Sequence, residues 1–288
     1  MIDLHDVRYV RLGTRNIEES TRYAQEVLGL ELVRTEQGAR YFRSDSRDHT
    51  LVYFEGDSND HTTGFELADA AGIDAAAAEL DNAGYRVKAG SREECEQRRV
   101  EGLVNFIDPS GNSIDLVVRP HHSGRRYFPS RDAGITGFSH IGLRSSDPAR
   151  DEKFWTQVMS ARVSDRLGNS PLLRIDPVHH KIALFPSSFA GVQHINHQVE
   201  GIDDIMRAYY MLKEKGVRIV FGPGRHPTSG AMFLYFAGPD GMTYEYSTGV
   251  RVFTEEEMST VRPRQFPFEA STSLCMWGSR PDIPEFKS

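Results

Sequence analysis

The segment "VQHINHQVEGIDD", residues 192–204, contains two histidines three positions apart, His194 and His197, and a pair of aspartates after a turn. Imidazole nitrogens and carboxylate oxygens are ordinary metal ligands, but this spacing alone decides little. Residues at i and i+3 share a face on a helix and lie on opposite faces of a strand. Whether the segment is a metal site or a polar strand depends on the elements around it.

Composition limits the class of protein. The chain has 288 residues, 39% of them hydrophobic, which is enough for one large domain or two ordinary ones. Its net charge is −7 and no lysine/arginine block stands out, so we expect no nucleic-acid partner. Two distant cysteines, Cys95 and Cys275, argue against a disulfide framework or a cysteine metal site. Without an apolar run long enough for a membrane span or a signal core, a soluble cytoplasmic protein is expected.

The chain repeats itself. "YVRLGTRNIEESTRYAQEVLGL", from Tyr9, matches "HIGLRSSDPARDEKFWTQVMSA", from His140, and each predicts a strand, a cap residue and an amphipathic helix. "FELADAAGIDAAAAELDNAGYRV" matches "HINHQVEGIDDIMRAYYMLKEKGVRI", and each predicts a strand, a helix, a glycine cap and another strand. "NFIDPSGNSIDLV" and "YFAGPDGMTYEYS" are both hairpin patterns.

These matches predict an α+β fold: a tandem duplication in which each half pairs two βαβββ units around a cavity. We expect an N-terminal domain over residues 1–125 and a C-terminal domain over 133–260. The polar segment 121–132 is the expected linker. Residues 261–288 form a tail rich in proline and aromatic residues, which we expect to dock on the protein.

The duplication allows positions to be compared within one chain. We predict three pairs of equivalent strand positions: Tyr9 and His140, Phe65 and His194, and Asp115 and Glu245. The second half therefore carries two histidines and a glutamate where the first half has two residues that bind no metal. Such a triad leaves coordination sites open and suits Fe(II), and also Mn(II). His194 is the predicted ligand, placed at the start of its strand, and His197 is predicted to point to the opposite face.

Further motifs follow in the second half. "VHHKIALF" carries His180 before an apolar strand, and "GPGRHPTSGAMFLYFAGPDGMTYEY" carries His226, Tyr235 and Glu245. On the basis of these motifs and the triad, the sequence resembles the vicinal oxygen chelate superfamily (the glyoxalase, bleomycin-resistance and dioxygenase fold). The resemblance covers nearly the whole chain. The resemblance is specifically to its two-domain type I extradiol catechol dioxygenases, whose N-terminal half is metal-free. Homo-oligomers are common in such enzymes.

The resemblance implies roles. Fe(II) on the triad His140, His194 and Glu245 would bind a catechol and then O2. His180 would be the acid/base, although a one-residue slip would exchange it with its neighbour His179, predicted on the opposite face. Tyr235 would hydrogen-bond a substrate oxygen, and His226 would be a further polar contact. The product would be a ring-opened semialdehyde.

The substrate is expected to carry a bulky apolar or second-ring substituent. Phe185, Phe189 and Phe221 are candidates for an apolar wall, and the tail segment "RQFPFEASTSLCMW" for a lid. Core packing is the other interpretation of these phenylalanines. Arg225 is a candidate substrate contact, and Arg174 or Arg225 would serve a carboxylated catechol instead.

Alternatives remain within and outside this reaction class. Glyoxalase-like isomerases or transferases share the metal site, and dioxygenases of the 4-hydroxyphenylpyruvate type share the fold. A metal-free small-molecule-binding protein is the non-enzymatic alternative. The aspartates Asp203 and Asp204 are predicted to begin a helix. The other histidines are treated as surface residues: His5, His49, His61, His121 and His122.

Overall fold

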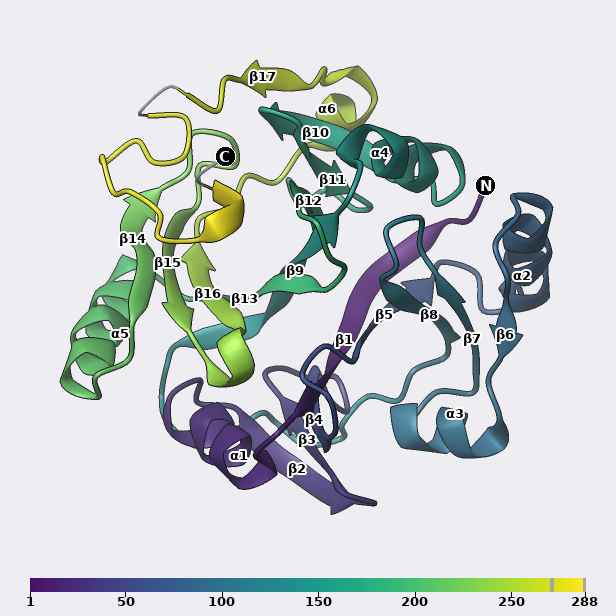
Figure 1. Ribbon diagram of the computed structural model, residues 1–288, viewed down its shortest axis with the longest axis horizontal. Helices are drawn as coiled ribbons and strands as arrows, with labels where there is room; N and C mark the ends of the chain where they lie inside the picture. The colour runs from purple at the N-terminus through teal and green to yellow at the C-terminus, as the bar shows by residue number, and fades with distance from the viewer. Residues whose placement is uncertain (270–271, 287–288) are drawn as a thin grey trace.

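The structure, a computed structural model, describes residues 1–269 and 272–286. Two curved β-sheets dominate it, one from each half of the chain (Figure 1). The first half runs from purple to blue in Figure 1 and the second from teal to yellow. The two sheets and their few helices confirm the predicted α+β class and the tandem duplication.

The first sheet has eight strands in the order β2-β3-β4-β1-β5-β8-β7-β6. Their bounds are β1 (Leu4–Thr14), β2 (Glu31–Glu36), β3 (Ala39–Arg43), β4 (Leu51–Glu55), β5 (His61–Leu67), β6 (Lys88–Ala89), β7 (Gly102–Ile107) and β8 (Ser113–Val118). The neighbouring strands β1 and β5 each begin a βαβββ unit, so the two units of this half join edge to edge along that pair.

The second sheet has nine strands in the order β14-β15-β16-β13-β9-β12-β11-β10-β17. Their bounds are β9 (Ile135–Ser145), β10 (Arg162–Leu167), β11 (Ser170–Arg174), β12 (Ile182–Pro186), β13 (Val192–Val199), β14 (Ile219–Arg225), β15 (Met232–Ala237), β16 (Thr243–Thr248) and β17 (Arg264–Phe266). Here β9 and β13 form the central antiparallel pair, as β1 and β5 do in the first half.

The helices begin where local capping chemistry favours it. Asn16 caps α1 by accepting a hydrogen bond from the Glu19 amide, and Asp147 caps α4 in the same way. Asp203 and Asp204 lie in the first turn of α5, as predicted, and Asp204 accepts a hydrogen bond from the Gly201 amide. The helix bounds are α1 (Ile17–Glu26), α2 (Ile73–Asn82), α3 (Arg92–Arg98), α4 (Pro148–Gln157), α5 (Ile202–Glu214), α6 (Glu255–Thr260) and the 3₁₀ turns η1 (Pro239–Gly241) and η2 (Pro284–Phe286).

One continuous core joins the two halves. Phe65 of β5 packs on Trp155 of α4, with ring centroids 5.3 Å apart. The hydroxyls of Tyr53 and Tyr244 hydrogen-bond across the same boundary, and the Tyr23 hydroxyl donates to the Ala237 carbonyl at 2.7 Å. We therefore expect the folding of the two halves to be coupled.

The chain after residue 260 packs along the second sheet. β17 adds a parallel strand beside β10, and in Figure 1 the yellow segment lies next to β14 and β15. Cys275, Ile283 and Phe286 are buried in an apolar cluster with residues of β12, β14 and β15. Residues 270–271 and 287–288 of the predicted tail lie outside the described residues.

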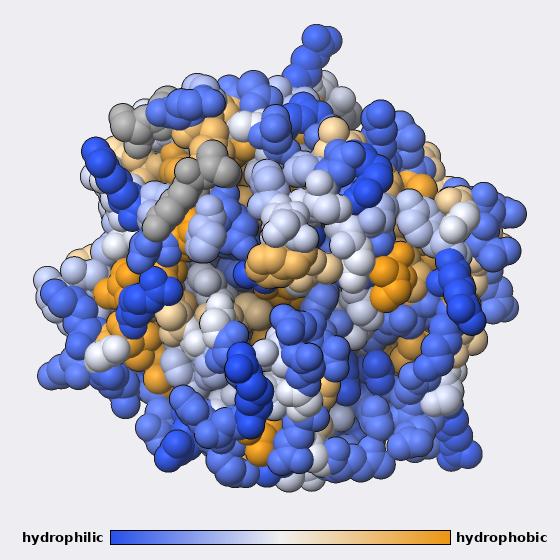
Figure 2. All heavy atoms as spheres, viewed as in Figure 1, coloured by the Kyte–Doolittle hydropathy of each residue, from blue (hydrophilic) through white to orange (hydrophobic). Residues whose placement is uncertain are grey.

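The outer surface is mostly hydrophilic on the face shown in Figure 2, with small, separate apolar patches. Within residues 1–269 and 272–286, no helix is both long and apolar enough to cross a membrane.

Candidate active site

Three neighbouring strands bring His140, His194 and Glu245 together. His140 lies on β9, His194 on β13 and Glu245 on β16, and β13 lies between the other two strands. Asn196 of β13 pairs with both His140 and Glu245, and His194 lies two residues before it. Residues two apart on a strand share a face, so all three side chains project from one face of the sheet.

The triad is compact and buried. Nε2 of His140 lies 3.1 Å from Nε2 of His194 and 3.1 Å from Oε2 of Glu245. Nε2 of His194 lies 3.5 Å from the same oxygen. That oxygen is buried and accepts no hydrogen bond, which is costly for a carboxylate with no cation beside it. Two imidazole nitrogens converging on an unpaired carboxylate oxygen fit a single divalent metal ion.

Protonation favours the same interpretation. Burial lowers the pKa of His194 to about 3, more than the nearby Glu245 raises it, so the ring is neutral at neutral pH. Burial by itself would raise the pKa of Glu245, but the neighbouring His140, His226 and His194 rings bring it below its ordinary value. Neutral imidazole and ionised carboxylate are the forms that bind a metal.

Gln193 orients the His194 ring. Nδ1–H of His194 donates to the Gln193 side-chain oxygen, which leaves the lone pair of Nε2 free toward the triad. The sequence analysis missed Gln193, although it directly precedes a predicted ligand.

The strand register corrects one equivalence. His194 is the third residue of β13, not the first, and it pairs with Gly142 of β9. The corresponding position on β1 is Arg11, which pairs with Thr62. Thr62, and not Phe65, is therefore the first-half counterpart of His194. The error arose in the segment between strand and helix. β5 ends at Leu67 and α2 begins at Ile73, six residues later, whereas β13 ends at Val199 and α5 begins at Ile202, three residues later. Matching the two "GID" motifs without a gap therefore displaced the strands by three residues.

At the corresponding positions of the first half, the side chains are engaged in hydrogen bonds within that half. The Tyr9 hydroxyl donates to Asp115 at 2.8 Å, and Nε of Arg98 on α3 donates to the same carboxylate oxygen at 2.9 Å. Asn105 donates to the other oxygen of Asp115 at 2.8 Å. The only carboxylate among these three positions is therefore already neutralised by an arginine.

His180 lies beside the triad. Its ring centroid is 4.2 Å from that of His140, and the residue is buried. His179 was predicted on the opposite face, but both residues lie in the loop before β12 and their Nδ1 atoms are 3.1 Å apart. Strand alternation does not apply in that loop, which is why the prediction for His179 was wrong. The pKa of His180 is lowered well below its ordinary value by burial and by the histidines around it.

Tyr235 and His226 cover another side of the triad. The Tyr235 ring lies edge-on to His194, with centroids 5.3 Å apart, and its hydroxyl is 3.2 Å from Nε2 of His226. His226 stacks on Phe233 at 3.8 Å, and its Nδ1–H donates to the Leu274 carbonyl. Burial and the Glu245 carboxylate raise the pKa of Tyr235 well above its ordinary value, so its hydroxyl remains a donor.

An aromatic cluster adjoins these polar groups. Phe185 lies 5.8 Å from the His194 ring, and Phe221 lies 5.6 Å from Tyr235, measured between centroids. Phe286 contacts both phenylalanines, at 4.8 and 6.0 Å, and also Tyr235 at 6.1 Å. The sequence analysis missed Phe286, because nothing local to "PDIPEFKS" indicates which part of the protein the segment meets.

The other residues considered as substrate contacts lie outside this aromatic cluster. Phe189 is 57% exposed beneath the Arg144 guanidinium, so it is not part of this cluster. Arg174 is buried and donates to the Val163 carbonyl and to Ser164. Arg225 is exposed and its Nε donates to the Gly230 carbonyl, so its substrate role stays a prediction.

His49 was predicted at the surface, but it is 4% exposed. It stacks on Tyr9 at 5.2 Å and bonds to Asp48 at 3.0 Å. His5, His121 and His122 are exposed and His61 is half-buried, broadly as predicted. On β13, His197 is fully buried, contacts Phe138 at 6.0 Å and does not belong to the triad cluster.

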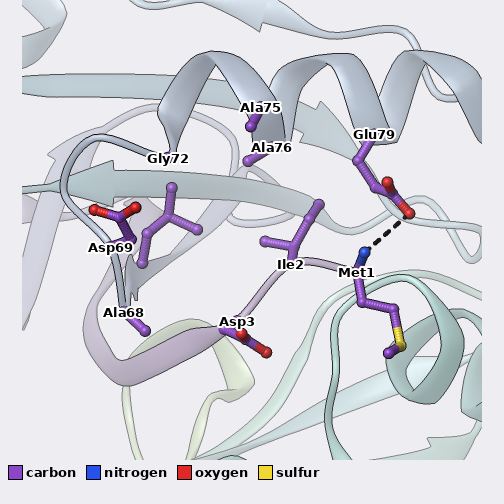
Figure 3. Close-up of a pocket in the computed structure, with 10 residues that line it drawn as sticks. Met1, Ile2, Asp3, Ala68, Asp69, Gly72, Ala75, Ala76 and Glu79 are labelled. Carbon is purple, nitrogen blue, oxygen red and sulfur yellow. Dashed lines mark ion pairs between the residues drawn. The ribbon is translucent and has the colours of Figure 1, made fainter.

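A cavity of about 360 Å³ beside the N-terminus is a separate feature (Figure 3). Met1, Ile2 and residues of α2 line it, and the terminal amine pairs with Glu79 at 3.2 Å. Its lining contains neither histidine nor cysteine, and it includes none of the triad residues. We therefore assign the chemistry to the triad.

Family comparisons agree with the duplicated fold. The model of the Glyoxalase/Bleomycin resistance protein/Dioxygenase superfamily matches twice, at residues 7–116 and 137–246. The chain belongs to this superfamily. The two matches correspond to the two halves, and the triad lies within the second.

Proteins with different named activities are similar to this chain. A biphenyl-2,3-diol 1,2-dioxygenase of Sphingomonas paucimobilis is 27% identical, over 87% of this chain and 90% of that protein. An iron-dependent extradiol dioxygenase of Rhodococcus jostii (strain RHA1) is 26% identical, over 96% and 97%. The structure of a Mn(II)-bound glyoxalase from Novosphingobium aromaticivorans superposes with a TM-score of 0.86 at 24% identity, covering 99% of this chain and 94% of that one. That last likeness concerns the fold alone, so the reaction must be argued from the site.

Proposed function

We propose that this protein is an extradiol ring-cleaving dioxygenase, which opens a catechol beside its diol and incorporates both atoms of O2. The observation that carries the proposal is the set of proton-handling groups around one buried triad. His180, Tyr235 and His226 all lie against the triad residues. An isomerase or transferase of the same superfamily would not need this set. The dioxygenase relatives support the same choice.

His140, His194 and Glu245 would hold the metal, and Fe(II) is the proposed ion. When bound, the metal would lower the pKa of a catechol hydroxyl and bring catechol and O2 into contact. Nitrogen and carboxylate ligands also suit Mn(II), so the ion itself must be measured.

The chain's own residues would handle the protons. His180 is neutral, so its imidazole can take a proton from the substrate and return it when the ring opens. Tyr235 stays protonated and would donate a hydrogen bond to a substrate oxygen on which charge develops. Nδ1–H of His226 donates to the Leu274 carbonyl, so its Nε2 would accept the Tyr235 hydroxyl proton until a substrate oxygen replaced it as the acceptor.

The test is anaerobic reconstitution with Fe(II), followed by oxygen uptake with a panel of catechols. We expect one O2 consumed per catechol and a yellow ring-fission product, and reconstitution with Mn(II) in parallel compares the two ions. A metal-loaded protein that consumed no O2 with any catechol, yet isomerised a thiol adduct, would be a glyoxalase-like enzyme. A full-length protein that bound no metal would be a binding protein.

The proposed substrate is a catechol with an apolar aryl substituent. Phe185, Phe221 and Phe286 are buried in one apolar cluster beside the triad, and they would form the apolar surface for this substituent. The two arginines considered for a substrate carboxylate, Arg174 and Arg225, bond to backbone carbonyls instead. Burial of a phenyl substituent contributes about 2 to 3 kcal/mol, or roughly 30- to 150-fold in kcat/KM.

Specificity is tested with catechol, a carboxymethyl catechol and an aryl catechol side by side. We expect kcat/KM to be highest for the aryl compound. A preference for the carboxylated compound would contradict the apolar surface and would direct attention to Arg225.

A further inference from the structure

A chain of hydrogen bonds runs away from the triad behind His180. Nδ1 of His180 lies 3.1 Å from Nδ1 of His179, and Nε2 of His179 lies 2.8 Å from Oδ2 of Asp165. Asp165 is bound in turn by Arg264 of β17, through the backbone amide, Nε and Nη2, at 3.0, 3.0 and 2.7 Å. The chain therefore connects the proposed acid/base to the strand that the tail adds to the sheet.

We infer that His179 and Asp165 are positioning residues, which hold His180 in the tautomer with its proton on Nδ1 and its Nε2 lone pair free. The inference rests on the proposed function for the role of His180. The tautomer of His180 itself follows from the order of donors and acceptors along this chain of hydrogen bonds.

The carboxylate sets that order. Against the effect of burial, the hydrogen bonds from His179 and then from Arg264 keep the pKa of Asp165 below its ordinary value, so Asp165 accepts only. Nε2 of His179 must then donate. Burial lowers the pKa of His179 even though Asp165 opposes it, so the ring is neutral and its Nδ1 is an acceptor. The proton between the two rings consequently belongs to Nδ1 of His180.

Burial makes this arrangement hard to avoid. His179 is 0% exposed and Asp165 is 2% exposed, so water cannot replace a missing partner. The His179 ring also stacks on Phe253, with centroids 5.9 Å apart and planes 22° apart, which fixes its orientation. A buried polar group without its bond costs free energy, so the neighbours select one tautomer.

The first half has a hydrogen-bonded set at the corresponding positions, made of different residue types and without the triad. Arg34, Asp48 and His49 occupy the positions of Asp165, His179 and His180, each pair being 131 positions apart. Arg34 binds Asp48, and Asp48 bonds to Nδ1 of His49. In the second half His179 stands at the position of Asp48 and Asp165 at that of Arg34, so the carboxylate is separated from the last histidine by one more hydrogen-bonded residue. The first half thus offers a matched control.

The kinetic test uses Asp165→Asn and Asp48→Asn. Asparagine has the shape of aspartate but presents a donor group where the carboxylate presents only acceptors. We expect Asp165→Asn to lower kcat about 10- to 100-fold, a part of what an acid/base supplies. Metal content and the anaerobic Kd for catechol should stay within about twofold of wild type. Asp48→Asn, in the half without the triad, should leave kcat unchanged.

A double variant separates positioning from a general loss of structure. If Asp165 acts through His180, Asp165→Asn should not slow the His180→Phe enzyme further. Multiplied losses would refute the inference. Arg264→Met, at a partly exposed arginine, keeps the carboxylate and should lower kcat by only about twofold to fivefold. It serves as the second variant if Asp165→Asn does not fold.

A spectrum of the metal-free, full-length protein tests the tautomer without any turnover. Long-range ¹H–¹⁵N correlation on ¹⁵N-histidine protein, assigned with His180→Phe, should give His180 the Nδ1–H pattern in wild type and a mixed pattern in Asp165→Asn. An Nε2–H pattern in wild type would overturn the inference. Failure to turn over any catechol would instead refute the proposed function, and the spectrum would still decide the positioning.

Discussion

His194 and His197 lie on one strand with different surroundings, which makes them a pair for testing the metal site. His194→Ala removes one of three ligands and should abolish both metal binding and activity. His197→Ala leaves the triad complete and should retain most of the metal. Metal per chain is measured after reconstitution by elemental analysis. The reverse pattern would show that the strand faces are assigned wrongly.

His180 is predicted to act in chemistry and not in coordination. His180→Phe should keep the metal and still bind catechol without O2, but kcat should fall about 10²- to 10⁴-fold, the range for loss of a general acid or base. Metal content, anaerobic binding and steady-state oxygen uptake are measured on one preparation. Loss of metal equal to that of His194→Ala would make His180 a ligand.

At the scale of the element, β13 separates two environments. On one face of β13, His194 belongs to the triad. On the other face, His197 points into the core, and neither ring nitrogen of His197 has a hydrogen-bond partner. Burial lowers the pKa of His197 to about 4. Such a ring resists protonation in the folded state, whereas the unfolded chain takes up the proton near pH 6.5.

This difference predicts a pH dependence of stability. Between about pH 6.5 and 4 the unfolded state binds more protons, so the free energy of unfolding falls as the pH falls. At pH 5 the loss from His197 is about 2 kcal/mol relative to pH 7.5. His197→Phe should lose less stability over this interval, by about that amount. Denaturant unfolding of the metal-free protein at the two pH values measures it, and equal losses in both proteins would contradict the assignment.

At the scale of the whole molecule, the shared core predicts that the two halves unfold together. Trp155 of the second half is fully buried against Phe65 of the first. Trp155→Ala should therefore destabilise the protein by roughly 3 to 5 kcal/mol. It should also accelerate amide hydrogen exchange in β5, across the boundary. Trp277 is 52% exposed, so Trp277→Ala is the matched control and should change little. Faster exchange confined to the second half would mean that the halves are independent.

The sequence by itself determined the duplicated α+β architecture, the helix starts and the ligand types. These features are local. Asn16 and Asp147 cap their helices through bonds within three residues. The sequence repeat makes His140 equivalent to Tyr9, and Glu245 equivalent to Asp115. The superfamily resemblance followed from the same motifs and is confirmed by two family matches.

Only the tertiary structure decided the rest. The connection from strand to helix is longer in the first half, from Leu67 to Ile73, than in the second, from Val199 to Ile202, so Thr62 and not Phe65 proved to be the counterpart of His194. The burial of His49, the Asp165–His179 bond and the contact of Phe286 with Phe185 each join segments distant in sequence. Such contacts depend on how separately formed elements pack together, and that information is spread over the whole chain.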